Sequence, residues 1–163
     1  ILDRPDWDSW FMGIACLVSL RSRDVSTKHG AVICDHVHRL IGVGYNGFPR
    51  GCDDSVMPTE RPAKYDVTIH AEENCLLNSQ NLLGNNYTLY VTGMPCSRCM
   101  IKIMQFDICR IVYGNITSCC VDESQSNLVQ NLAKMKKIEL YSSNFDCRKN
   151  INLFQGILSS SSV

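Results

Sequence analysis

The spacing of apolar positions predicts that helices and strands both occur along the whole chain. Apolar residues at 7, 10, 11, 14, 17 and 18 fall on one helical face, which predicts a helix over 5–22. Short runs rich in β-branched and aromatic residues predict strands at 31–34, 40–44, 87–92, 108–113 and 137–141. Further helices are predicted at 70–80, 96–106 and 123–136.

The order of these elements predicts an α/β fold. A polar connection at 35–39 joins the first two strands as an antiparallel hairpin, whereas the second half alternates strands with helices. Strands connected through helices run parallel with right-handed crossovers. We therefore expect a mixed five-stranded sheet with helices on both faces. No linker or repeat divides the sequence, so a single domain over 1–163 is predicted, with a mobile tail at 159–163.

One long stretch, residues 46–68, lacks this periodicity. It is rich in glycine, proline and aspartate, which predicts a loop. A loop longer than about 12–15 residues in a compact domain is usually functional. The stretch is therefore a candidate binding segment.

Charge and hydropathy argue against two classes of partner. The 163 residues include 16 Lys plus Arg and 16 Asp plus Glu, so the formal net charge is zero. A nucleic-acid-binding domain usually has a basic surplus, and a membrane-spanning helix needs about 20 apolar residues in succession. The sequence has neither feature, so we expect neither a nucleic acid nor a membrane as a partner.

The ten cysteines could form disulfides or bind a metal, and the cellular compartment decides between these two uses. The first residues are rich in charge and show no export signal, which favours a cytoplasmic location. In such a reducing compartment the Cys96-x-x-Cys99 spacing favours metal or redox chemistry over a structural bridge.

Two short motifs, each opening a predicted helix, supply ligands of the kind that zinc prefers. They are His70-Ala71-Glu72 and Pro95-Cys96-Ser97-Arg98-Cys99. One imidazole and two thiolates make three ligands, which is the number that a catalytic zinc uses, with its fourth position left to water. The alternatives are a redox pair of cysteines and a structural zinc. The candidates for a fourth structural ligand are His29, His36, His38 and Cys52.

The order H-x-E followed by P-C-x-x-C is the signature of zinc-dependent base deaminases. In that chemistry zinc lowers the pKa of bound water, and the resulting hydroxide attacks the ring carbon that bears the amine. A carboxylate must take the water proton and hand it to the ring nitrogen, and it must then protonate the departing ammonia. Glu72 is the predicted proton shuttle, whereas Glu73 is expected to point elsewhere.

From about Arg21 to Tyr113 the chain resembles the deoxycytidylate (dCMP) deaminases of the cytidine deaminase superfamily. The zinc motif marks the superfamily, and the run Gly-Tyr-Asn-Gly-Phe-Pro-Arg-Gly-Cys at 44–52 narrows the resemblance to the dCMP branch. The resemblance implies a three-layer α/β/α cytidine-deaminase-like fold. It also implies hydrolysis of dCMP to dUMP and ammonia, which supplies thymidylate synthesis. The chain departs from the family pattern at residues 114–120, because family members often have a tyrosine there.

The resemblance also implies roles for individual residues and partners. Zinc is held by His70, Cys96 and Cys99, with Glu72 as catalytic residue. Family members are typically homohexamers that dCTP activates and dTTP inhibits, with Mg²⁺ accompanying the triphosphate. The implied substrate-binding residues are Asn46 at the sugar, Ser22 and Arg23 near the phosphate, and Ala71. The implied allosteric residues are Gly47, Arg50, Gly51, Asp53 and Asp54.

Two other readings of function stay open at this point. The first is another deaminase, acting on a nucleoside or on a nucleic acid. The second is a catalytically silent, nucleotide-sensing zinc protein. Glu72 separates the second from the first, because a silent protein has no need of a proton shuttle.

Overall fold

The computed structural model describes residues 3–84 and 86–161 and contains one mixed sheet, whose strand order is β2-β1-β3-β4-β5. β1 is antiparallel to β2 and β3, whereas β3, β4 and β5 are parallel. This confirms the expected hairpin and the parallel crossovers of the second half. The strands are β1 (Gly30–Cys34), β2 (Leu40–Tyr45), β3 (Tyr87–Val91), β4 (Ile108–Tyr113) and β5 (Glu139–Ser142).

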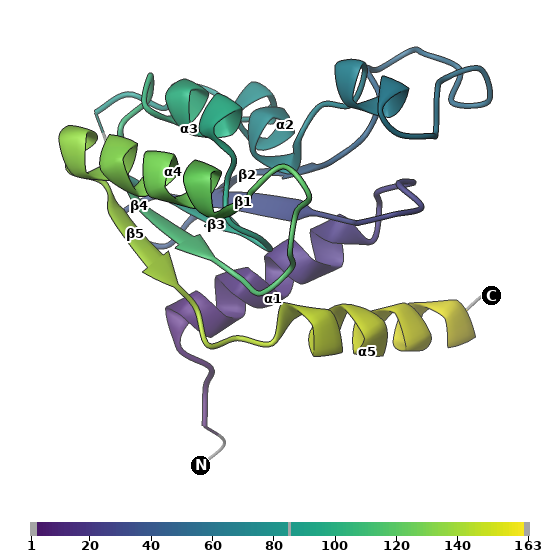
Figure 1. Ribbon diagram of the computed structural model, residues 1–163. Helices are drawn as coiled ribbons and strands as arrows, with labels where there is room; N and C mark the ends of the chain where they lie inside the picture. The colour runs from purple at the N-terminus through teal and green to yellow at the C-terminus, as the bar shows by residue number, and fades with distance from the viewer. Residues whose placement is uncertain (1–2, 85, 162–163) are drawn as a thin grey trace.

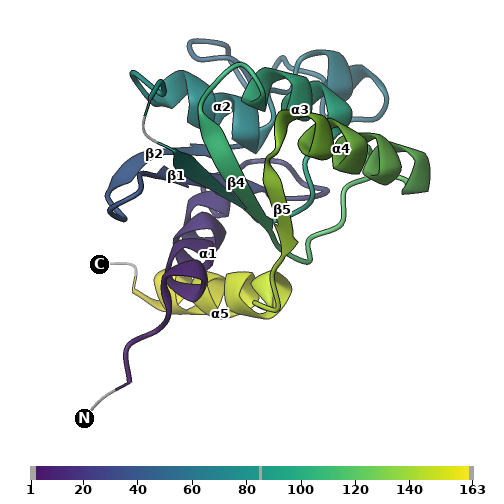
Figure 2. The same cartoon turned by 90° about the vertical axis from the view of Figure 1, so that its left-hand side faces the viewer.

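Helices cover both faces of the sheet, which confirms the three-layer α/β/α arrangement. Helices α2, α3 and α4 lie on one face, and α1 and α5 cross the other (Figures 1 and 2). The helices are α1 (Trp7–Ser19), α2 (Ala71–Asn78), α3 (Ser97–Ile103), α4 (Glu123–Lys136) and α5 (Cys147–Ser160). No helix in the described part of the chain is both long and apolar enough to cross a membrane.

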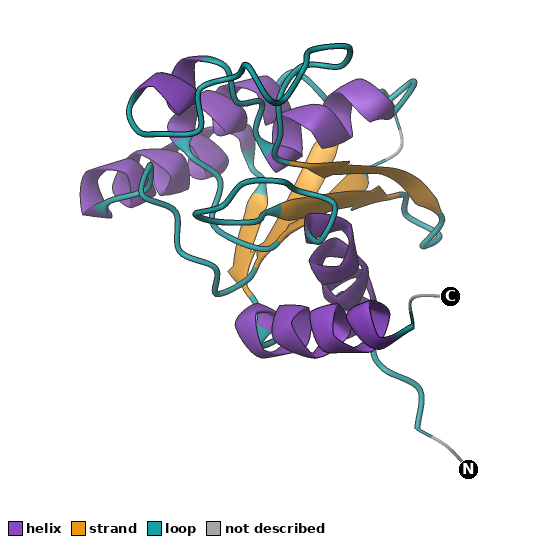
Figure 3. Cartoon of the chain, turned by 90° about the vertical axis from the view of Figure 1, so that its right-hand side faces the viewer, coloured by secondary structure: helices purple, strands orange, loops and turns teal. Residues whose placement is uncertain are grey.

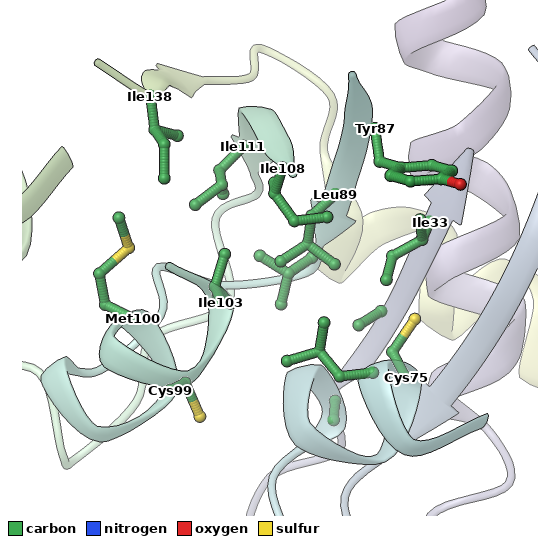
Figure 4. Packing of buried hydrophobic residues seen from close by; sticks show 14 of the residues in the cluster. Ile33, Cys75, Tyr87, Leu89, Cys99, Met100, Ile103, Ile108, Ile111 and Ile138 are labelled. Carbon is green, nitrogen blue, oxygen red and sulfur yellow. The ribbon is translucent and has the colours of Figure 1, made fainter. Parts of the chain in front are cut away.

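The sheet separates two hydrophobic cores because alternate side chains of each strand point to opposite faces. Ile33, Leu89 and Ile111 pack toward α2 and α3, together with Met100 and Ile103 (Figure 4). Their neighbours on the same strands, among them Val32, Tyr90 and Val112, pack against α1 and α5 instead. The central strands β1, β3 and β4 are thereby held between helices.

The strand register brings several strand ends to one edge of the sheet. Gly30 at the start of β1 pairs with Tyr45 at the end of β2. Ala31 pairs with Val91 at the end of β3, and Val91 pairs with Tyr113 at the end of β4. The segments that leave these strands therefore meet, although they are far apart in sequence. Loops gather on this side of the molecule (Figure 3).

The C-terminal helix is the main difference from the prediction. The sequence pattern predicts no helix here and a mobile tail at 159–163, whose first residues, Ser159 and Ser160, belong to the last turn of α5. Residues 162 and 163 lie outside the described residues. Asp146 caps the start of α5 by accepting a hydrogen bond from the backbone N–H of Lys149, and Ile151 and Phe154 pack on the α1 side.

The long loop is less irregular than predicted. It contains a short 3₁₀ helix, η1 (Ala63–Asp66), and an isolated antiparallel bridge between Gly47 and Ile69. The loop projects beyond α2 (Figure 1). The bridge joins its two ends, so His70 follows directly from a segment anchored to the end of β2.

Candidate functional site

Two helix N-termini place one imidazole and two thiols together. His70 is the N-cap residue of α2, and Cys96 is the N-cap residue of α3. Nδ1 of His70 lies 3.3 Å from Sγ of Cys99 and 3.6 Å from Sγ of Cys96. In Figure 4 the sulfur of Cys99 points away from the side chain of Ile103. The thiols of α3 thus face His70 rather than the core.

This cluster fits zinc. Tetrahedral bonds of about 2.3 Å to sulfur and 2.0–2.1 Å to nitrogen place neighbouring ligand atoms about 3.6–3.8 Å apart, close to the observed spacing. In the described part of the chain no other histidine, cysteine or carboxylate joins this group. Three protein ligands are the set that a catalytic zinc uses, since the fourth position is then free for water.

The cluster favours negative charge on the sulfur of Cys96, whereas the hydrogen bond with Cys96 and burial raise the pKa of Cys99. The Cys99 thiol is hydrogen-bonded to Cys96, and this bond holds the pKa of Cys96 well below its usual range. The hydrogen bond to Cys96 also raises the pKa of His70. Both thiols lie at the start of α3, where the positive end of the helix dipole stabilises a thiolate. Thiolate is the form of cysteine that binds a metal.

Glu72 and Glu73 lie next to each other on α2 in opposite environments. Glu72 is buried and lines the cavity that contains His70 and Cys96. Burial raises its pKa to about 7, so the carboxyl can take up and release a proton near neutral pH. Glu73 points elsewhere and forms an ion pair of 2.5 Å with Lys102.

The close approach of α2 to the sheet depends on Gly44. A Cβ at this position would clash with the backbone N of Cys75 and the carbonyl oxygen of Ala71. The absence of a side chain therefore lets the first turn of α2, with Ala71 and Glu72, lie directly on β2. Ala71 itself is buried and lines the cavity.

Asn46 lines the same cavity at the end of β2. Its Oδ1 accepts a hydrogen bond of 2.8 Å from the backbone N–H of His29, and its Nδ2 donates to the carbonyl oxygen of Thr27 at 3.0 Å. These two bonds hold the amide in place. The His29 ring also lines the cavity, and burial lowers its pKa to about 4, so it is neutral at pH 7.

Ser22 and Arg23 lie apart from the cluster. Ser22 is buried, and its hydroxyl donates a hydrogen bond to the carbonyl oxygen of Asn46. This bond helps to hold the backbone of Asn46 in place. The Arg23 guanidinium is exposed and forms an ion pair of 2.7 Å with Asp54. Arg23 lines a second cavity and not the one that contains His70.

The second cavity has a volume of about 300 Å³ and is formed by the 46–68 loop, the segment after α1 and the outer side of α2. It brings together three arginines, namely Arg21, Arg23 and Arg50. Four of the five residues expected at an allosteric site line it, and Asp53 does not. The Asp53 carboxylate instead accepts hydrogen bonds from the backbone and side chain of Ser55.

The cavity beside the cluster contains residues that sequence reasoning did not single out. Arg61, Lys64 and Tyr65 reach it from the far end of the long loop, and Ser118, Cys119 and Cys120 reach it from the segment after β4. No local motif marks them, because they reach the cavity only through the fold. The nearest signal was the departure of 114–120 from the expected family pattern.

The first two cavities adjoin each other. Asp24, Lys64 and Thr68 line both of them. Nζ of Lys64 lies 3.0 Å from Oδ2 of Asp24 and 3.0 Å from the Ser26 hydroxyl oxygen, with the lysine side chain 6% exposed. A buried ion pair therefore stands between the two sites.

Comparison with known proteins places this site in a family. The family model of the cytidine and deoxycytidylate deaminase zinc-binding region matches residues 5–115. The chain is 37% identical over 118 residues to a probable deoxycytidylate deaminase of Drosophila melanogaster, covering 66% of this chain and 58% of the relative. It is 34% identical over 117 residues to the deoxycytidylate deaminase of Homo sapiens, covering 68% of this chain and 66% of the relative.

The chain thus spans less than two thirds of the length of these two relatives. Among solved structures it is similar to a dCMP deaminase from the cyanophage S-TIM5, in complex with dCMP and dUMP. The TM-score is 0.70 with 23% identity, over 87% of this chain and 100% of the other. At this level of identity the likeness establishes the fold.

Proposed function

Because this chain belongs to the cytidine and deoxycytidylate deaminase family, we propose that it is a zinc-dependent enzyme that hydrolyses dCMP to dUMP and ammonia. The observation that carries the proposal is the group formed by His70, Cys96 and Cys99, beside a cavity that His70, Cys96 and the buried Glu72 line. The names of the relatives and the nucleotides bound by the cyanophage enzyme support dCMP as the substrate.

In the proposed mechanism, three residues bind zinc and a fourth transfers protons. His70, Cys96 and Cys99 would hold zinc, which when bound supplies an acidified water as the nucleophile. Glu72 would take a proton from the attacking water and pass it to the ring nitrogen. It would then take the proton of the hydroxyl on the attacked carbon and pass it to the departing amine, which leaves as ammonia. Its raised pKa suits both steps, because a group that titrates near neutral pH gives and takes a proton equally well.

The remaining cavity residues would orient the nucleotide. Asn46 is preorganised by its bonds to the backbone of His29 and Thr27, and we assign it to the sugar. We assign the 5′-phosphate to Arg61, since Arg23 faces the other cavity and Lys64 is already paired with Asp24. Arg61 has no ion pair with any other described residue, so its charge is available to a phosphate.

The second cavity would be the regulatory site. Three arginines around a volume of about 300 Å³ suit a polyanionic ligand, and this size is at the lower end for small-molecule sites. We propose that dCTP with Mg²⁺ raises the activity and that dTTP lowers it through this cavity. The active form is proposed to be a homo-oligomer, with a hexamer as the expected state.

An activity comparison tests the substrate. The zinc-loaded protein is given dCMP, deoxycytidine or a cytosine-containing single-stranded oligonucleotide at equal cytosine concentration, and ammonia release is measured. We expect kcat/KM to be highest for dCMP. Turnover of deoxycytidine alone would point to a nucleoside deaminase and contradict the proposal. Turnover of the oligonucleotide alone would point to a polynucleotide substrate, and absence of turnover on all three would favour a silent zinc protein.

A further inference from the structure

Two adjacent thiols lie at the cavity that the candidate zinc ligands His70 and Cys96 also line. Sγ of Cys119 and Sγ of Cys120 are 3.9 Å apart, and both residues line the cavity. Cys119 is exposed, whereas Cys120 is half-buried. Neither belongs to the group formed by His70, Cys96 and Cys99. The deamination chemistry proposed above has no use for them.

The surroundings of Cys119 differ from those of an ordinary surface cysteine. Its Sγ lies 2.8 Å from the hydroxyl oxygen of Tyr65, which comes from the long loop. The guanidinium of Arg61 and Nζ of Lys64 lie over the Tyr65 ring, 5.8 Å and 5.9 Å from its centroid. The Tyr65 hydroxyl, the Cys120 thiol and the charge of Arg61 thus all act on one exposed sulfur.

These neighbours favour the thiolate of Cys119 over that of Cys120. Partial burial acts to raise the pKa of Cys119, but hydrogen bonds with Tyr65 and Cys120 and the charge of Arg61 together hold it below its ordinary value. Partial burial and the neighbouring Cys119 raise the pKa of Cys120. Because the thiolate is the nucleophilic form of cysteine, the exposed member of the pair is also the more reactive one.

We propose that Cys119 and Cys120 form a modification site for hydroperoxides, in which oxidation converts the two thiols into a disulfide at the rim of the cavity. The thiolate of Cys119 attacks one peroxide oxygen, the O–O bond breaks, and the leaving oxygen takes a proton to give an alcohol or water. The sulfenic acid of Cys119 is then attacked by the sulfur of Cys120. The S–O bond breaks, the thiol proton passes to the leaving oxygen, and water is released.

Bond formation changes the rim of the cavity. The two sulfur atoms must approach from 3.9 Å to about 2.05 Å, and the oxidised Cys119 can no longer present a thiol to Tyr65. The modification therefore changes the contact by which Cys119, in the segment after β4, meets Tyr65 of the long loop. A thiol reductant reverses it, because disulfides exchange with free thiolates.

The test is peptide mass after mild oxidation of the zinc-loaded protein by hydrogen peroxide, without any nucleotide. Trypsin releases residues 111–134, which contain Cys119 and Cys120 and no other cysteine. We expect this peptide to lose two hydrogen atoms and to regain them after treatment with dithiothreitol. The peptides that contain the exposed Cys52 and Cys109 serve as references in the same digest. They are expected to be oxidised only at higher peroxide concentration.

Variants distinguish the cysteine that attacks the peroxide from the cysteine that then forms the disulfide. In Cys120→Ser the sulfenic acid of Cys119 should persist and be trapped by dimedone, whereas in Cys119→Ser residues 111–134 should stay unmodified at the same dose. Tyr65→Phe should slow the oxidation of Cys119, which mere exposure of the sulfur would not predict. Oxidation of Cys52 or Cys109 before residues 111–134, or release of zinc before that peptide changes, overturns the proposal. The readout needs no substrate, so it stands apart from the test of deamination.

Discussion

Glu72 and Glu73 show how the environment of one residue decides its chemistry. They are chemically identical and adjacent on α2, yet only Glu72 is buried at the cavity. Glu73 is held by Lys102 on the outside of the helix. The motif placed Glu72 two residues after a ligand, and the first turn of α2 carries it to the same cavity. The pair therefore provides a variant and its own matched control.

We predict that Glu72→Gln lowers kcat for ammonia release by at least about 10²-fold, because a glutamine cannot carry the proton. Zinc content should be unchanged, since Glu72 is not one of the three candidate ligands. Glu73→Gln should keep its activity and lose at most about 1 kcal/mol of stability, as expected for a partly exposed ion pair. Steady-state kinetics and metal analysis of both variants check this. Full activity in Glu72→Gln would rule out the proton-shuttle role.

Asp24, at the boundary of the two cavities, makes the stability of the fold depend on pH in the acid range. Burial alone would raise its pKa, but hydrogen bonds from the backbone N–H groups of Thr27 and Ser26, together with Lys64, bring it below 3.8. A carboxyl with a lowered pKa in the folded state stabilises the fold above its unfolded pKa. That contribution is lost as the pH falls through the folded pKa.

We predict that Asp24→Asn costs roughly 3 kcal/mol of unfolding free energy at neutral pH, because it leaves the buried Lys64 unpaired. The difference from the wild type should shrink as the pH is lowered through and below 3.8, where the wild-type carboxylate is also protonated. Urea unfolding of both proteins across this range measures it. Asp53→Asn, in the exposed part of the long loop, is the control and should show a small effect, because the hydrogen-bond partner of Asp53 is the neighbouring Ser55 and not a buried cation. A pH-independent difference for Asp24→Asn would contradict the interpretation.

At the scale of elements, the site depends on how closely α2 lies against β2. The helix begins at His70 and its first turn carries Ala71 and Glu72, so any shift of α2 moves a ligand and the proton shuttle together. Gly44 permits the contact, since a Cβ there would meet the backbone of α2. Backbone cannot rotate away as a side chain can, and therefore the helix itself would have to move.

We predict that Gly44→Ala destabilises the fold by about 1–3 kcal/mol, the usual cost of overpacking, and lowers kcat as well. Gly156→Ala in α5 is the matched control, because its added Cβ meets nothing within 4 Å. The control should gain about 0.5–1 kcal/mol from the lower entropy of the unfolded chain and keep its activity. Thermal unfolding and kinetics are measured on both. Unchanged activity in Gly44→Ala would show that α2 can move without disturbing the site.

At the scale of the whole molecule, two cavities stand side by side with a buried ion pair between them. Asp24 and Lys64 line both, so a ligand in one cavity changes the surroundings of groups that face the other. Arg21, Arg23 and Arg50 line the second cavity, whereas His70, Cys96 and Glu72 line the first. This arrangement is the physical basis of the regulation proposed above.

We predict that dCTP with Mg²⁺ raises and dTTP lowers the rate of dCMP deamination. Arg50→Ala should raise the half-maximal effector concentration about tenfold or more, because a lost hydrogen bond to a charged group costs about 1.5–3 kcal/mol. Arg148→Ala, which changes an exposed arginine at the start of α5, is the control and should respond normally. Light scattering with and without triphosphate tests the oligomer. An activity that neither triphosphate changes would remove the regulatory role from the second cavity.

The sequence alone determined those features that depend on short-range pattern. The elements 123–136 and 108–113 coincide with α4 and β4, and both metal motifs open helices as expected. Helical and strand periodicity, like ligand spacing within a motif, involves residues a few positions apart. Such patterns are therefore visible without any knowledge of the fold.

Only the tertiary structure decided which cavity each distant residue faces. Arg23 and Arg61 are both loop arginines, and no local pattern sends the first to one cavity and the second to the other. Cys119 meets Tyr65 across more than fifty positions of sequence, because β4 and the bridged loop end at the same side of the sheet. Helix α5 is different, because its local signals are present in the sequence: Asp146 is its N-cap, and Cys147, Ile151 and Phe154 follow helical spacing. Only the tertiary structure decided that this apolar face packs against α1, because the surface that receives it is formed by distant parts of the chain.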